Sequence, residues 1–118
     1  MILPTIALLA ALTMSPQKFM VRTMAETMGV NPDYAACIVE RESAWDPAAL
    51  GDRGRAVGLW QWHLGSWRHV RRAMGLSIED RRHEPVASTA AALWWIRQGH
   101  DDWWTAAKLC EAHKGGRR

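Results

Sequence analysis

The sequence predicts a mainly helical domain that carries one small β-hairpin. Ser15 and Asn31 are capping residues, and each is followed by a proline, which suits the first turn of a helix. Residues 90–96 are apolar on all sides, which is typical of a buried central helix. Three glycines fall within residues 51–58, where they favour tight turns with positive φ, and we expect the hairpin there.

The 118 residues suffice for one domain, and we divide the chain into three parts. Residues 1–14 form an apolar segment that is too short to span a bilayer. We interpret this segment as a first helix or as a weak signal-like sequence, since no Lys or Arg precedes its apolar run. Residues 15–113 form the folded domain, and residues 114–118 form a basic tail.

Capping residues, prolines and glycines delimit the helices of the folded domain. We expect six or so helices in all. The segments with helical signals are 16–28, 32–43, 66–74, 85–98 and 103–113.

One carboxylate of the second helical segment is placed differently from its neighbours. Glu42 continues the apolar stripe that includes Ile38, whereas Glu40 points about 160° away from it. An apolar surrounding and the C-terminal end of a helix both disfavour the charged form, so we expect a raised pKa for Glu42. A general acid in glycoside cleavage needs a carboxyl group of this kind. The alternative is a Glu that forms a salt bridge with Arg41 or Arg53.

Two blocks of sequence flank the glycine-rich stretch. Residues 42–47 read ESAWDP and residues 58–62 read GLWQW. The first resembles the ES-x-aromatic-x-P motif of the soluble lytic transglycosylases, and the second resembles their GLMQI segment, in the same order and at a similar separation. The resemblance covers about residues 15–112 and is sharp in these two blocks. It implies a lysozyme-like fold, with the hairpin beside the substrate cleft, and peptidoglycan glycan strands as the substrate.

The resemblance also implies a reaction and a set of site residues. Glu42 would be the catalytic residue that protonates the glycosidic oxygen between N-acetylmuramic acid (MurNAc) and N-acetylglucosamine (GlcNAc). Its carboxylate would then deprotonate the C6 hydroxyl of MurNAc, which closes onto C1 and leaves a 1,6-anhydroMurNAc end. No metal or cofactor is implied. The expected substrate-binding residues are Ser43, Trp60 as a ring platform, Gln61, Trp62 and His113.

Two candidate site residues, His113 and Asp52, lie outside the two matching blocks. The family's closing Tyr-Asn-x-Gly motif has no Tyr or Asn here, and His113 is our candidate for its polar function. Asp52 is a possible second carboxylate, because goose-type and other lysozymes place one in a comparable region. There it would position water for inverting hydrolysis. We favour the alternative, in which the Asp52 side chain bonds backbone N–H groups of its own turn.

The composition leaves other classes of function open. Eight Trp occur against one Tyr and one Phe, and we expect about half of the Trp side chains to be structural. The net charge of +3 suits an anionic bacterial wall and nucleic acid equally well. A nucleic-acid binder leaves the two sequence blocks unexplained, so we expect no nucleic-acid partner. The stronger rivals are a muramidase and a non-catalytic wall-binding or virion module.

The two cysteines bear on the location of the protein. Cys37 and Cys110 lack the spacing of metal ligands. In an exported protein they would join the second helix to the last, whereas in a cytosolic or virion protein they would be buried thiols, which we favour. We expect a protein of the cell envelope or periplasm, or of a phage virion. We also expect no stable membrane span and a monomer unless the chain is part of a virion.

Overall fold

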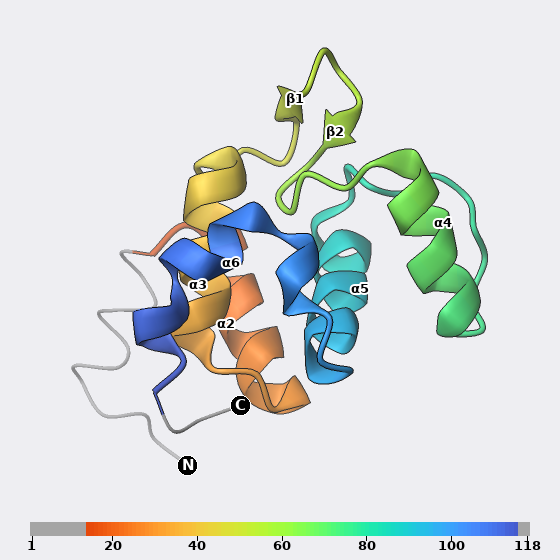
Figure 1. Ribbon diagram of the computed structural model, residues 1–118. Coiled ribbons are helices and arrows are strands. Elements are labelled where there is room, and N and C mark those ends of the chain that lie inside the picture. Colours follow the sequence, from red (N-terminus) through yellow and green to blue (C-terminus); the bar gives the residue numbers. More distant parts are fainter. Residues whose placement is uncertain (1–13, 116–118) are drawn as a thin grey trace.

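Helices make up most of residues 14–115, the part of the chain that the computed structural model describes (Figure 1). The elements follow one another as α2 (Pro16–Met28), α3 (Pro32–Ser43), β1 (Leu50–Gly51), β2 (Ala56–Val57), α4 (Leu64–Ala73), α5 (Pro85–Arg97), η1 (Asp101–Trp103), α6 (Thr105–Leu109) and η2 (Glu111–His113). This mainly helical architecture with one small sheet confirms the prediction from the sequence. The expectation for the apolar N-terminal segment falls on residues 1–13, which lie outside the described residues.

The first two helices begin where the capping signals predict. The Ser15 side chain accepts a hydrogen bond from the backbone N–H of Lys18 at 3.1 Å, and the Asn31 side chain accepts one from the N–H of Asp33 at 2.9 Å. A proline follows each cap, where its missing N–H has no partner to lose. Gly29 ends α2 in the left-handed conformation, with φ 77°.

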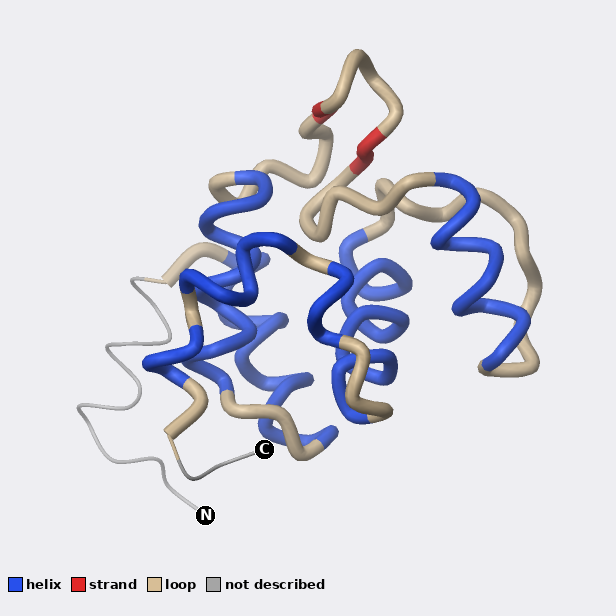
Figure 2. Tube along the Cα trace, viewed as in Figure 1, coloured by secondary structure: helices blue, strands red, loops and turns tan. Residues whose placement is uncertain are grey.

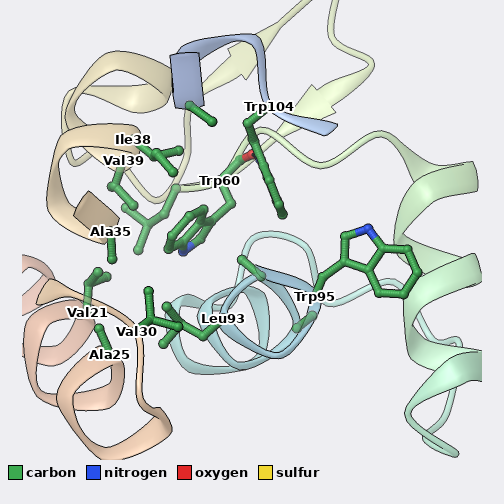
Figure 3. Packing of buried hydrophobic residues seen from close by; sticks show 14 of the residues in the cluster. Val21, Ala25, Val30, Ala35, Ile38, Val39, Trp60, Leu93, Trp95 and Trp104 are labelled. Carbon is green, nitrogen blue, oxygen red and sulfur yellow. Dashed lines mark hydrogen bonds between the residues drawn. The ribbon is translucent and has the colours of Figure 1, made fainter. Parts of the chain in front are cut away.

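The hydrophobic core lies between α2, α3 and α5. Helix α2 packs against both α3 and α5, and Figure 3 shows apolar side chains from these helices meeting. The labelled side chains include Val21 and Ala25 of α2, Ala35, Ile38 and Val39 of α3, and Leu93 of α5. Residues 91–93 are fully buried, as expected for a central helix.

Tryptophan side chains fill the core where the segment after the hairpin enters it. Trp60 is fully buried, and its Nε1–H donates to Thr89 Oγ1 at 3.0 Å. The Trp104 ring packs edge-on against Trp60, with 5.6 Å between centroids, and donates to the Trp60 carbonyl oxygen at 2.9 Å (Figure 3). Trp60 is therefore a core residue. The platform role expected for it is wrong, because neither ring face reaches solvent.

The strands β1 and β2 form an antiparallel hairpin that projects beyond the helices (Figure 1). Leu50 pairs with Val57, and Gly51 pairs with Ala56. Residues 52–55 connect the two strands. Figure 2 shows the hairpin within the long loop region that joins α3 to α4, where the glycines predict it.

The side chain of Arg82 fastens the hairpin to the loop that precedes α5. It donates from Nη1 to the carbonyl oxygens of Arg55, at 2.8 Å, and Trp62, at 3.1 Å. Asp80 accepts from its Nε at 2.8 Å. Gly58, with φ 84°, lies so close to the Arg82 carbonyl oxygen that a Cβ there would collide with it. These contacts fix the backbone on both sides of the second sequence block.

The C-terminal segment differs from the single helix expected for residues 103–113. It is divided into η1, α6 and η2, and the first break falls at Trp104, which is extended with φ −104° and ψ 118°. This conformation directs the indole onto the core, and its burial and hydrogen bond to Trp60 override the helical preference of the segment. Helix α4 also begins earlier than expected, at Leu64.

Cys37 of α3 and Cys110, directly after α6, form a disulfide, with their Cα atoms 5.8 Å apart. The expectation of two buried thiols is therefore wrong. The cysteines are 73 residues apart in sequence, and they meet because α6 packs against α3. This packing is a tertiary contact, which cysteine spacing alone does not reveal.

Two kinds of feature are absent from residues 14–115, a membrane-spanning helix and a cluster of metal-binding side chains. Within that range, no helix is both long enough and apolar enough to cross a bilayer. Nor do His, Cys, Asp and Glu side chains of the described residues gather in groups of three or more that could hold a metal ion.

Candidate active site

Glu42 lies in the last turn of α3, where its carboxyl group is half-buried. Burial raises the pKa of Glu42, and the nearby His63 offsets part of this increase. Glu40, by contrast, is exposed and accepts a hydrogen bond from Trp45 Nε1 at 3.0 Å. The two carboxylates therefore lie in different environments, as helical periodicity predicts. Among the described residues, Glu42 forms no ion pair with an arginine, so the salt-bridge alternative finds no support.

The carboxyl group of Glu42 lies at a pocket of about 140 Å³. Its walls come from the end of α3, the segment after the hairpin, the start of α4, and the η1–α6 segment. The lining residues are Glu42, Gln61, Trp62, His63, Ser66, Trp103, Trp104 and Thr105. The pocket thus joins the two sequence blocks to the C-terminal segment.

Asp52 does not line the pocket itself, but its side chain contacts His63, which does. Its Oδ2 lies 2.8 Å from His63 Nε2, and about half of each side chain is exposed, 54% for Asp52 and 51% for His63. This hydrogen bond lowers the pKa of Asp52, and the nearby Arg55 adds to the effect. The alternative that we favoured, a side chain bonded to backbone N–H groups of its own turn, is therefore wrong. The carboxylate is held against an imidazole ring that shares the pocket with Glu42.

The side chains of Ser43 and Gln61 are both engaged with backbone groups. Ser43 is buried, and its hydroxyl donates to the Val39 carbonyl oxygen at 3.2 Å. Gln61 Nε2 donates to the carbonyl oxygens of Ala49, at 3.1 Å, and Gly58, at 3.0 Å. Gln61 still lines the pocket, but its amide hydrogens hold the two ends of the hairpin together.

The remaining expected site residues are divided between two places. Trp62 lines the pocket with little exposure, and its Nε1–H donates to the Ser88 carbonyl oxygen at 3.2 Å. His113 lies elsewhere, on a groove of about 610 Å³ that Lys18 and Trp45 also line. The structure does not bring His113 to Glu42. The expectation that it takes over the polar function of the family's Tyr is therefore not supported by its position.

Five residues that line the pocket were not predicted as site residues, namely His63, Ser66, Trp103, Trp104 and Thr105. Trp103 is 43% exposed, and its ring packs against Trp95, at 4.9 Å between centroids, and against His69, at 5.6 Å. We expected it only to begin a helix. His63 directly follows the second block, and its position was the one signal that could have identified it. No signal in the sequence indicates that Trp103 lies beside Glu42, because only the folded chain places it there.

Comparison with protein families gives one match. Residues 19–113 match the model of the Transglycosylase SLT domain. No match to the chain was found among curated proteins or among solved structures. The matched range includes Glu42, both sequence blocks and every residue that lines the pocket. The chain therefore belongs to the Transglycosylase SLT family, whose members are lysozyme-like lytic transglycosylases that cleave peptidoglycan.

Proposed function

We propose that the protein cuts the β-1,4 bond between MurNAc and GlcNAc with Glu42 as its catalytic residue, and that it leaves 1,6-anhydroMurNAc ends. The observation that supports this most directly is the half-buried carboxyl group at the pocket, with a pKa raised by burial. A raised pKa keeps a larger share of the carboxyl group protonated near neutral pH, as a general acid requires.

One carboxyl group serves both halves of the proposed reaction. Glu42 gives its proton to the glycosidic oxygen as the bond from that oxygen to C1 breaks. The carboxylate then takes the proton of the C6 hydroxyl, whose oxygen bonds to C1. Glu42 ends the cycle protonated again, so the reaction needs no net proton from solvent.

Trp103 is the residue that we propose as a platform for a sugar ring, in place of the buried Trp60. Its indole is the most exposed of the three tryptophan rings that line the pocket, and contacts with Trp95 and His69 hold it in place. Aromatic faces combine apolar area with a rigid geometry, which suits the flat faces of sugar rings. Trp62 and Gln61 would contribute the floor of the site rather than its main contacts.

The Cys37–Cys110 disulfide supports a location outside the cytoplasm. Disulfides persist in the periplasm and on cell or virion surfaces, whereas the cytosol keeps thiols reduced. We therefore propose that the enzyme works in the cell envelope or from a phage particle, where it meets peptidoglycan.

The function can be tested by substituting two glutamates that lie on opposite faces of the same helix. Purified sacculi are digested with wild type, Glu42→Gln and Glu40→Gln, and the loss of turbidity and the released fragments are measured. We expect Glu42→Gln to lose at least about a hundredfold in rate, the lower end for a general acid, with an unchanged circular dichroism spectrum. The exposed Glu40→Gln should retain activity.

Several outcomes would contradict the proposal. Lysis by Glu42→Gln at the wild-type rate would remove Glu42 from the reaction. A wild-type protein that binds sacculi without releasing fragments would instead support a non-catalytic wall-binding module. Equal loss in Glu40→Gln would mean that the loss in Glu42→Gln reflects the helix rather than the chemistry.

A further inference from the structure

We propose that His63, oriented by Asp52, is a second acid–base group that gives the enzyme a hydrolytic branch. In this branch His63 activates a water molecule that attacks C1, so that reducing MurNAc ends form beside anhydro ends. The inference rests on the proposed function, because Glu42 acts as the acid in both branches. His63 would be a catalytic residue, and Asp52 would be its positioning residue.

The first support is the position of His63. It lines the same pocket as Glu42 and is close enough to act electrostatically on that carboxyl group. The backbone before it is fixed, because Trp62 forms two hydrogen bonds with Val57 of β2, at 3.0 and 3.1 Å. Arg82 holds the Trp62 carbonyl oxygen from the other side. The backbone that carries the imidazole is therefore held in place between the hairpin and α4.

The second support is the tautomer that the contact with Asp52 selects. An ionised carboxylate only accepts hydrogen bonds, so Nε2 of a neutral His63 must carry the hydrogen in its 2.8 Å contact with Asp52. The other ring nitrogen, Nδ1, then has a free lone pair and is able to take a proton. An Asp that orients a His in this way is a recurring arrangement in acid–base catalysis.

The third support is access to water. About half of each side chain in the Asp52–His63 pair is exposed, so solvent reaches the ring at the edge of the pocket. In the proposed step, the water oxygen bonds to C1 and a water proton passes to Nδ1. The bond from C1 to the glycosidic oxygen breaks, and that oxygen takes the proton of Glu42. His63 then loses its proton to solvent, and Glu42 regains one from solvent.

The ratio of the two products tests this branch. Fragments from sacculi are analysed by mass spectrometry, because an anhydro end is lighter than a reducing end by one water molecule. We expect wild type to give both ends, and His63→Gln to lower the ratio of reducing to anhydro ends at least about tenfold. This is a cautious value for the loss of a general base. Asp52→Asn should lower the ratio too, since its amide can donate to Nε2 and leave the hydrogen on Nδ1. The exposed His83→Gln, outside the pocket, is the control and should keep the wild-type ratio.

The ratio separates this inference from the proposed function. Exclusively anhydro ends from wild type, or an unchanged ratio in His63→Gln, would overturn the hydrolytic branch and leave the transglycosylase reaction intact. An equal loss of both products in His63→Gln would also overturn it, since a structural role would explain that result. Failure of wild type to cleave at all, or full activity of Glu42→Gln, would overturn the proposed function and the branch with it.

Discussion

The Cys37–Cys110 disulfide should contribute a large part of the stability of this small domain. The two cysteines are separated by 73 residues. Closing a loop of that length in the unfolded chain corresponds to about 4 kcal/mol at 25 °C in the chain-entropy description of disulfides. Domains of this size have free energies of unfolding of about 5–15 kcal/mol. Reduction should therefore remove a large fraction of the stability and leave roughly 1–11 kcal/mol.

Urea denaturation with and without a thiol reductant measures this contribution. With a urea dependence of about 2 kcal/mol per molar, a loss of 4 kcal/mol shifts the midpoint down by about 2 M. Activity should fall at urea concentrations that the oxidised protein tolerates. The reason is that the disulfide ties α3, which carries Glu42, to the end of α6, whose first residue Thr105 lines the pocket.

The double variant Cys37→Ala/Cys110→Ala separates the covalent link from the packing of the two sulfur atoms. Its midpoint should be low, and adding reductant should leave it unchanged. A wild-type midpoint that is the same with and without reductant would refute the reasoning, provided that thiol titration confirms complete reduction. Two free thiols in protein purified from an oxidising compartment would refute the pairing itself.

Two further predictions concern the pocket. Because burial raises the pKa of Glu42 in the folded protein, the folded state holds this proton more tightly than the unfolded chain. The unfolding free energy of wild type should therefore fall relative to Glu42→Gln as the pH rises from the ordinary carboxylate range through the raised pKa. Urea midpoints of both proteins between about pH 4 and 8 check this, and parallel profiles would contradict it. Trp103→Ala should weaken the binding of a soluble glycan fragment about tenfold, or about 1.4 kcal/mol, since it removes an exposed ring from the pocket. Calorimetric titration measures this with Phe19→Ala, an exposed aromatic on α2, as the control, and equal affinities of wild type and Trp103→Ala would contradict it.

The sequence predicts those parts of the fold that depend on local signals. Ser15 and Asn31 mark the starts of α2 and α3 because a cap satisfies backbone N–H groups within a few residues. The separation of Glu42 from Glu40 follows from helical geometry in the same way. Gly54 and Gly58 help to locate the hairpin in the same way, because each adopts a positive φ, which is a local property that glycine accommodates without strain.

The features that the sequence does not reveal depend on contacts between distant segments. Nothing near Trp60 or Trp103 in the sequence shows that the first is buried and the second is exposed at the pocket. The break at Trp104 arises from its hydrogen bond to Trp60, 44 residues away. The pairing of Cys37 with Cys110 likewise depends on how α6 packs against α3.

The second sequence block acts as a scaffold for the pocket more than as a set of substrate ligands. Gln61 donates to two carbonyl oxygens of the hairpin, and its Oε1 lies so near Gly51 that a Cβ there would collide with it. Trp60 is buried in the core, and Gly58 allows the close approach of the loop before α5. A match to this block therefore identifies the shape of the site and the position of Glu42. The product depends instead on which group can deliver or exclude water at C1, and the proposed hydrolytic branch assigns that role to His63, which lines the pocket one residue beyond the block.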